Sequence, residues 1–208
     1  MIPAWLRTRI DRRRLNDPGY EYLFEPNTSG EVVCFDCETT GLDPRKAEIL
    51  SIGAVKIKDN RILLSQRLEL YMRPSGVIAS DSIKIHHLRH VDLMDAMDPA
   101  EGIRQFIEFI GNRTLVGYYL EFDVAMVNKY LRPWLGIRLP NRQIEVSSIY
   151  HDIKIGHIPT QPVDLRFDSI MKALDLPMVG KHDALNDALM TAMIYVKLQN
   201  LRAGINRD

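Results

Sequence analysis

The sequence predicts an α/β fold, in which a mixed five-stranded sheet with its first three strands antiparallel carries helices on both faces. Two observations support this prediction. Three stretches of strand-forming residues follow one another with short links between residues 31 and 72, and short links favour antiparallel pairing. Helical and strand patterns then alternate along the rest of the chain, which is typical of helices packed on a sheet.

Length and composition are those of a soluble globular protein. The 208 residues are enough for one domain with a sizeable core, and 46% of them are hydrophobic. The formal net charge is zero, which disfavours a protein that coats long nucleic acid but not an enzyme that holds a few nucleotides through metal ions. Two cysteines imply no disulfide framework, and no apolar run reaches the ~18 residues of a membrane helix. We therefore expect a cytoplasmic protein without a membrane segment.

Residues 1–30 are expected to form a basic arm ahead of a domain at 31–208, which begins after turn signals near Gly30. Its apolar residues Trp5, Leu6 and Ile10 are spaced for one side of a helix. The arm has two possible interpretations: a contact with nucleic acid or a partner, or a solvated helix docked on the domain. The docked helix is favoured. The basic character comes from Arg7, Arg9, Arg12, Arg13 and Arg14.

The remaining elements follow from periodicity and turn residues. Asp59-Asn60 reads as a tight turn that joins two strands in a hairpin. Gly156, Pro159 and Pro162 indicate a long loop over 152–165. The expected strands are 31–38, 48–57, 61–72, 114–118 and 143–147. The expected helices are 80–89, 99–111, 121–135, 166–175 and 183–201, the last with a core stripe of Leu185, Leu189, Met193 and Val196.

Two carboxylates, Asp36 and Glu38, end the first strand. At i and i+2 they point to the same side of the strand, where they repel each other unless a cation lies between them. Mg²⁺ and Mn²⁺ take such oxygen ligands, so this end of the strand is a candidate metal site. Thr39, Thr40 and Gly41 follow with hydroxyls and a backbone that a ligand can approach closely. The alternative is a buried strand that leaves into a polar turn.

A second candidate group surrounds the start of the last helix. Asp183 is a good N-cap, which leaves His182 in the preceding loop and Asp187 in the first turns. On one helix, residues i and i+5 would diverge by about 140°, whereas a histidine in the loop can face the same site as Asp187. The alternative is a capping motif with a surface histidine. Asp123, between a strand and a helix, carries little information alone.

Two further patterns are weak as metal sites. Cys34 and Cys37 point to opposite sides of a strand, so we expect small buried residues rather than a zinc or redox pair. His86, His87 and His90 cluster on an expected helix, but no acidic or cysteine ligand adjoins them at a recognised spacing. His86 remains a candidate for lining a pocket.

Taken together, these blocks resemble the histidine-bearing (DEDDh) branch of the DEDD exonuclease superfamily, which includes the proofreading epsilon subunits of bacterial DNA polymerase III and stand-alone relatives. The resemblance spans about residues 31–201. It rests on Asp36-Cys37-Glu38-Thr39-Thr40-Gly41, on the segment Ser80–Leu88 with His87 in place of a glycine, on Phe122-Asp123, and on His182-x-Ala184-Leu185-x-Asp187-Ala188.

This resemblance implies a ribonuclease H-like fold and 3′→5′ hydrolysis at the 3′ end of single-stranded DNA, with release of nucleoside monophosphates. It implies two divalent metal ions, Mg²⁺ or Mn²⁺, and His182 as the general base. The implied metal ligands, which also count as catalytic, are Asp36, Glu38, Asp123 and Asp187, with Asp36 as the candidate bridge. The implied substrate-binding residues are Thr39, Thr40, Gly41, His86 and Phe122.

Substrate and partner stay open. The family usually carries a polar pair such as His-Asn a few residues before the aspartate that corresponds to Asp123. This chain has Tyr118 and Tyr119 there. The same chemistry on RNA or short oligonucleotides is therefore an alternative, as is a non-catalytic, polymerase-associated nucleic-acid-binding module. A DNA polymerase is a candidate partner, although no polymerase-binding motif is evident and few residues follow 201. The oligomeric state is open as well.

Overall fold

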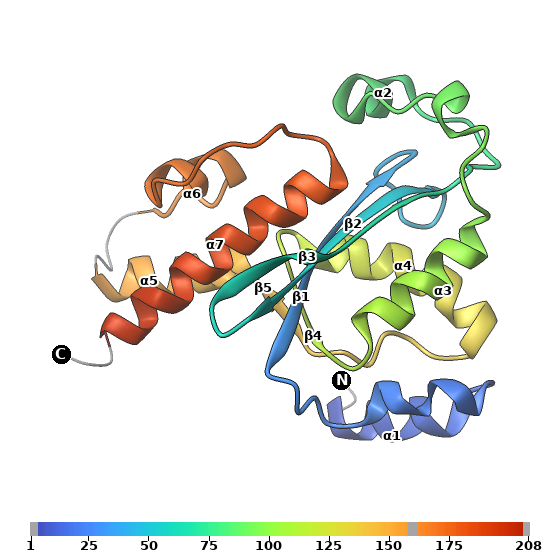
Figure 1. The fold of residues 1–208 in the computed structure, drawn as a ribbon, viewed down its shortest axis with the longest axis horizontal. Helices are drawn as coiled ribbons and strands as arrows, with labels where there is room; N and C mark the ends of the chain where they lie inside the picture. Colours follow the sequence, from blue (N-terminus) through green and yellow to red (C-terminus); the bar gives the residue numbers. More distant parts are fainter. Residues whose placement is uncertain (1–3, 158–161, 206–208) are drawn as a thin grey trace.

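A computed structural model describes residues 4–157 and 162–205 (Figure 1). Within these residues one sheet has the strand order β3-β2-β1-β4-β5. Strands β1, β2 and β3 are antiparallel, whereas β4 pairs parallel to β1 and β5 parallel to β4, which confirms the predicted mixed sheet. The strands are β1 (Glu31–Thr39), β2 (Ile49–Lys58), β3 (Arg61–Tyr71), β4 (Thr114–Gly117) and β5 (Gln143–Glu145).

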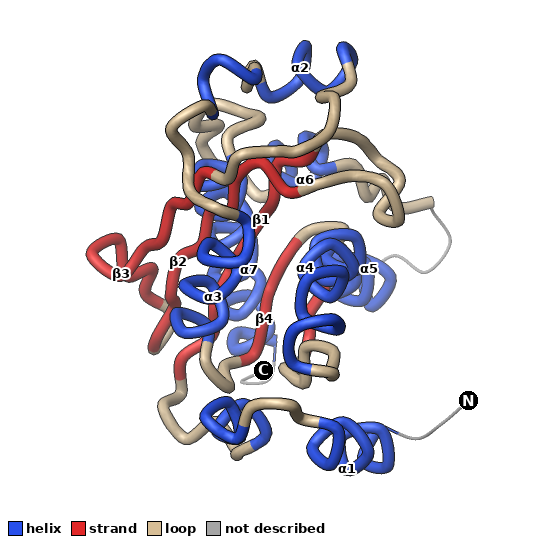
Figure 2. The backbone as a smooth tube through the Cα atoms, turned by 90° about the vertical axis from the view of Figure 1, so that its right-hand side faces the viewer, coloured by secondary structure: helices blue, strands red, loops and turns tan. Residues whose placement is uncertain are grey.

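Helices cover both faces of the sheet (Figures 1 and 2). Alternate residues of β1 enter two separate cores: Phe35 packs with α3 and α4, and Cys34 packs with α5, α6 and α7. The helices are α1 (Ala4–Arg14), η1 (Pro18–Phe24), α2 (Ser80–His86), η2 (His90–Leu93), α3 (Pro99–Ile110), α4 (Leu120–Leu135), α5 (Val146–His157), α6 (Phe167–Ala173) and α7 (Ala184–Ile205), where η marks a 3-10 helix. Within the described residues no helix is long and apolar enough to cross a membrane.

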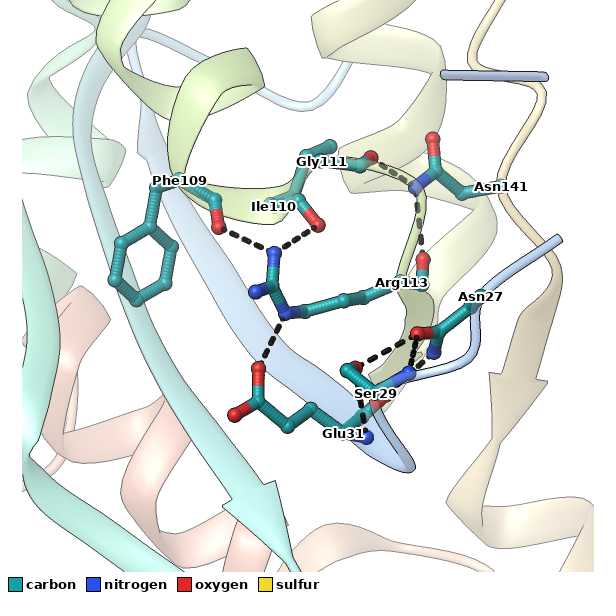
Figure 3. A network of polar contacts seen from close by, with 8 residues as sticks. All are labelled: Asn27, Ser29, Glu31, Phe109, Ile110, Gly111, Arg113 and Asn141. Carbon is teal, nitrogen blue, oxygen red and sulfur yellow. Dashed lines mark hydrogen bonds and ion pairs between the residues drawn. The ribbon is translucent and has the colours of Figure 1, made fainter. Parts of the chain in front are cut away.

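A polar network ties the start of β1 to the start of β4 (Figure 3). The Nε of Arg113 donates to Oε2 of Glu31 at 2.7 Å, and this guanidinium lowers the pKa of the Glu31 carboxyl. The side-chain amide of Asn141 donates to the carbonyls of Gly111 and Arg113 at 2.8 and 2.7 Å. These bonds join the start of β1 to the turn before β4, at the end of the sheet where the two parallel strands begin.

The N-terminal arm is docked on the domain, in agreement with the favoured of its two readings. The backbone N–H of Asn16 donates to the Leu135 carbonyl at 3.0 Å, and the Tyr20 ring meets Trp134 edge-on at 5.0 Å. Leu23 is buried in the core formed with α3 and α4. The side chains of Trp5 and Leu6, from the predicted apolar stripe, lie outside what the structure describes.

Two boundaries differ from the sequence prediction. The predicted loop at 152–165 was wrong at its start, because α5 continues to His157 and Ile153 packs on the core with α7. Residues 158–161 of that loop lie outside the described part of the chain. The predicted helix at 80–89 ends early, because His87 adopts a left-handed conformation with φ 60° and terminates α2 at His86.

The predicted core stripe of α7 is confirmed in part, because Leu189, Met193 and Val196 pack against the core as partly buried residues. Leu185, Leu189, Met193 and Val196 are only half-buried. The fully buried positions are Ala188, Met190, Thr191, Ala192, Ile194 and Leu198.

Candidate metal centre

Three carboxylates from two elements meet at the end of β1. Ligand oxygens of Asp36, Glu38 and Asp187 all lie within 4.8 Å of one another. Asp36 and Glu38 lie two residues apart on one side of β1, as the alternation of a strand requires. Asp187 comes from the first turn of α7, which covers that same face of the sheet. The structure thus places these residues together as the sequence prediction expected.

A glycine in β2 permits this meeting. Gly53 is the partner of Asp36 in the sheet. A Cβ at Gly53 would lie 2.1 Å from the backbone nitrogen of Leu185 and 2.2 Å from the carbonyl carbon of Ala184. The start of α7 therefore rests directly on the strand backbone. The sequence analysis missed Gly53, although a glycine inside an apolar strand is a signal for close approach of another backbone.

The loop before α7 places His182 beside Asp187. Asp183 caps the helix, since its Oδ1 accepts from the Asn186 N–H at 2.9 Å. His182 adopts φ 63°, and its backbone N–H donates to Oδ2 of Asp187 at 3.0 Å. Asp36, His182 and Asp187 line one cavity of about 170 Å³. The other residues that line it are Tyr118, Phe167, Asp168, Lys181 and Thr191, and Lys181 pairs with Asp168.

The three carboxyl groups of this cluster have raised pKa values. Burial raises the pKa of Asp36 well above its ordinary value, and the charges of Asp123, Asp187 and Glu38 add to that effect. Burial, followed by the charges of Asp187 and Asp183, raises the pKa of Glu38 to about 7. Burial raises the pKa of Asp187, against the opposing hydrogen bond from His182. Crowded oxygen ligands that repel one another fit a hard divalent cation such as Mg²⁺ or Mn²⁺.

Asp123 lies close to this cluster but on the other face of the sheet. It occupies the first turn of α4 and is only 4% exposed. Burial raises its pKa, and hydrogen bonds from the Cys37 thiol and backbone oppose that rise. Among the described residues the 4.8 Å group does not include Asp123. After burial, the charge of Asp123 is the strongest cause of the raised pKa of Asp36. Asp123 is therefore a fourth carboxyl group next to the cluster of three.

The two cysteines are buried and free, on opposite faces of the sheet. That arrangement agrees with the prediction of small buried residues and excludes a bond between them. Cys37 does more than fill space, because it contacts the Asp123 carboxyl.

The two threonines after Glu38 hold their own loop. The Thr39 hydroxyl donates to the Gly41 carbonyl at 2.8 Å, and the Thr40 hydroxyl accepts from the Glu48 N–H at 2.9 Å. A Cβ at Gly41 would meet nothing within 4 Å. The loop therefore presents an open backbone beside the carboxylates.

His86 is buried beside this loop. Its Nδ1 accepts from the Leu88 N–H at 3.0 Å, and burial lowers its pKa, so the ring is neutral with Nε2 as the donor. Nε2 lies near the Thr39 carbonyl without a hydrogen bond of good geometry. His86 and His90 belong to separate helices, α2 and η2, so the expected cluster of histidines on one helix was wrong.

Aromatic side chains stand where the family's polar pair was expected. The Tyr118 hydroxyl donates to the Leu165 carbonyl at 3.0 Å, and its ring meets Phe167 edge-on at 5.0 Å. Tyr119 adopts φ 56° and is 65% exposed. Its ring lies over Phe122, with centroids 6.5 Å apart and planes at 18°. His182, which lines the cavity with Asp36, and Tyr119, which follows the cavity residue Tyr118, both adopt left-handed conformations, a kind of backbone strain common at functional sites.

Comparisons with known proteins agree with this geometry. A family model described as Exonuclease (RNase T) matches residues 33–195. A DNA polymerase III PolC-type protein from Caldanaerobacter subterraneus subsp. tengcongensis is 29% identical over 178 residues, which are 84% of this chain and 12% of that protein. The DNA polymerase III subunit epsilon of Aquifex aeolicus is 25% identical over 169 residues, 81% of this chain and 80% of that protein.

Two solved structures share the fold. Escherichia coli exonuclease I in complex with a dT13 oligonucleotide has a TM-score of 0.72 at 12% identity, covering 86% of this chain and 43% of that chain. Cell-death related nuclease 4 has a TM-score of 0.71 at 15% identity, covering 83% of this chain and 64% of that one. The chain thus spans less than half of exonuclease I and about an eighth of the PolC-type relative.

Proposed function

Because the chain belongs to the exonuclease family, we propose that it is a metal-dependent 3′→5′ exonuclease. It hydrolyses the phosphodiester bond at the 3′ end of single-stranded DNA and releases nucleoside monophosphates. The observation that carries the proposal is the meeting of Asp36, Glu38 and Asp187 within 4.8 Å, beside a cavity that His182 lines together with Asp36 and Asp187. Hydrolysis of a phosphodiester requires an activated water and shielding of phosphoryl charge, and this set of residues suits both needs.

Each carboxylate has a place in the proposal. Asp36, Glu38 and Asp187 would hold divalent ions, and Asp123 would add a fourth carboxylate near Asp36. When bound, two such ions shield the charge of the phosphate and acidify a water molecule. Asp36 is the candidate bridge, because its pKa responds to all three other acids. The four carboxylates nearly offset the charge of two divalent ions.

His182 is proposed as the general base. Its side chain is exposed and lines the cavity with Asp36 and Asp187. A neutral imidazole accepts a proton from an attacking water near neutral pH. The bond from its backbone to Asp187 fixes the histidine relative to the carboxylates.

The 3′-terminal nucleotide is proposed to bind between the open Thr39–Gly41 backbone and the ring of Phe122, near His86. Tyr119 continues the surface of Phe122 with an exposed aromatic face on which a base can stack. DNA is favoured over RNA because the two relatives described above are DNA polymerase III proteins. Those names also support a DNA polymerase as partner. The family model carries the name of RNase T, which favours RNA as the second candidate substrate.

The test is digestion of 5′-labelled single-stranded DNA, duplex DNA and RNA of one sequence, with Mg²⁺ or Mn²⁺. We expect a ladder that shortens from the 3′ end, is fastest on single-stranded DNA and vanishes in EDTA. Faster digestion of RNA than of DNA would identify RNA as the substrate of the same hydrolytic reaction. The absence of shortening on every substrate under both metals would contradict catalysis and favour a non-catalytic nucleic-acid-binding module.

A further inference from the structure

A groove lined by basic side chains runs along α4, from the loop after β1 to helix α1. We name it the basic groove, and its volume is about 820 Å³. The basic residues that line it are Arg45, Lys129, Arg132, Arg138 and Arg142, against the acidic residues Asp11 and Glu121. The whole chain has a formal net charge of zero, so positive charge is concentrated here. The residues of the carboxylate cluster do not line this groove.

Several of these charges are available to a ligand. Arg132 and Arg142 are exposed, and neither forms an ion pair within the described part of the chain. Arg138 approaches Asp11 only to 4.0 Å. Lys129 donates to the Ala47 carbonyl at 2.7 Å, a bond that leaves its positive charge unneutralised.

The basic groove adjoins the catalytic cavity through an intermediate hollow. That hollow, of about 320 Å³, shares Tyr118 with the cavity lined by Asp36 and His182. It shares Glu121 and Gln143 with the basic groove. The three hollows therefore follow one another over the surface, from the carboxylates past the tyrosines to the arginines.

The length of the path suits a nucleic-acid strand. Glu121 and Arg132 are eleven positions apart on α4, which at 1.5 Å per residue spans about 16 Å. A helical strand carries one phosphate per 3.4 Å, so about five nucleotides cover this distance. The far wall includes Thr8 and Asp11 of α1, outside the 33–195 range of the family match. This wall is thus an addition to the family domain.

We propose that the basic groove binds the sugar–phosphate backbone of the substrate strand on the 5′ side of the bond to be cleaved. This inference rests on the proposed function, because it assumes a nucleic-acid substrate. A strand whose 3′ end reaches Asp36 would pass Tyr118 and Tyr119 and lay its phosphates against Arg142 and Arg132. The arm is then part of the substrate-binding surface through its docked position on α4.

The test compares two double variants for binding of 5′-fluorescein oligothymidylates dT4 and dT16, measured by fluorescence anisotropy in EDTA. One is Arg132→Gln with Arg142→Gln in the basic groove. The matched control is Arg61→Gln with Arg67→Gln on β3, where two exposed arginines lie outside the path. EDTA prevents cleavage, so the readout is independent of activity.

We expect the groove variant to lower the slope of log affinity against log salt for dT16 by about 1.4, at ~0.7 for each lost phosphate contact on a single strand. If the groove variant and the wild type bind dT16 with equal affinity at 1 M salt, this change in slope corresponds to about 25-fold weaker binding of dT16 by the variant at 0.1 M salt. Binding of dT4, which fills the catalytic cavity first, should change by less than about twofold. The control variant should match the wild type with both oligonucleotides.

Equal binding of dT16 by wild type and groove variant, or an equal loss in the control, would overturn the proposal and leave the groove as a surface for an acidic protein. A digest of dT4 with Mn²⁺ separates the two claims. If dT4 is cleaved but dT16 binding ignores the arginines, only the groove assignment fails. If nothing is cleaved but dT16 binding depends on them, only the catalytic proposal fails.

Discussion

Asp36 lies among the other three carboxylates of the site. Its carboxyl lies among Glu38, Asp123 and Asp187, and burial and all three charges raise its pKa. The Asp36 carboxyl therefore destabilises the metal-free protein, and a bound cation would offset that destabilisation. We infer that Asp36 serves function rather than folding.

Substitution of Asp36 tests this inference. We expect Asp36→Ala to lower exonuclease activity by at least ~100-fold, because a ligand shared by the proposed ions is lost. The same change should leave the melting temperature of the EDTA-treated protein equal or higher, since a repelling charge is removed. The measurements are digestion of labelled single-stranded DNA and a thermal melt. Near-wild-type activity would refute the bridging assignment.

Glu38 gives the metal-free protein a defined pH dependence. Its folded-state pKa of about 7 lies above the ordinary 4.5, so the folded state binds the proton more tightly than the unfolded chain does. Its contribution to the free energy of unfolding is complete below pH 4.5 and is lost as the pH rises to about 7. The loss is at most about 3 kcal/mol.

Urea unfolding in EDTA at pH 5 and pH 8 measures this effect. We expect Glu38→Gln to lose less stability than the wild type between these two pH values. Added Mg²⁺ should stabilise the wild type more at pH 8, where the ligands are ionised. The same pH dependence in variant and wild type would show that Glu38 does not carry the raised pKa.

Substitution of His182 tests its proposed role as the general base. We expect His182→Ala to slow turnover by about 100-fold while Mn²⁺ still binds, because the main-chain bond to Asp187 is kept. His182→Asn is the control, since asparagine tolerates the positive φ of this position. A loss of only a few fold in both variants would remove His182 from that role.

At the scale of elements, the site depends on how closely α7 approaches the sheet. Strand β1 was predictable because apolar residues and the acid pair alternate along it. The start of α7 was predictable because Asp183 is a strong cap. Their contact was not, since it depends on Gly53 in a third element. Sequence patterns report which face a residue takes within its own element, but not which backbone comes near it.

Substitution of Gly53 tests this contact. We expect Gly53→Ala to destabilise the protein by about 1–3 kcal/mol or more and to lower activity by at least ~10-fold, because the new Cβ would push Ala184 and Leu185 away and Asp187 with them. Gly156→Ala in α5 is the matched control, since a Cβ there meets nothing within 4 Å. Thermal melts and digestion rates report both effects. Equal values for Gly53→Ala and wild type would show that the contact does not position the helix.

The same reasoning explains the errors in the prediction. Gly156 and the prolines after it suggested a loop, but α5 reaches His157 because Ile153 packs on the core. The α7 stripe was assigned to residues that are only partly buried, whereas the fully buried positions include Ala188, Ala192 and Ile194. The left-handed His87 and Tyr119 carry no sequence signal, because such conformations are typical of glycine or asparagine.

At the scale of the molecule, the chain combines an exonuclease-family domain with an arm outside the family match. The arm rests on the end of α4 through Asn16 and Tyr20, and α1 forms one wall of the basic groove. The division at residue 30 stays a prediction. The α/β sheet was predictable from the strand and helix patterns, and the family from motif segments that follow one another in the expected order. The groove was not, because its arginines come from separate segments that only the fold brings together.

The central claim is that carboxylates of β1 and α7 form a divalent-metal centre, and Mn²⁺ titration tests it most directly. Metal-stripped wild type and Asp36→Ala are compared by isothermal titration calorimetry at pH 8, where Glu38 is ionised. We expect saturable Mn²⁺ binding by the wild type and its loss in Asp36→Ala. Absence of binding by the wild type, or equal binding by Asp36→Ala, would contradict the claim.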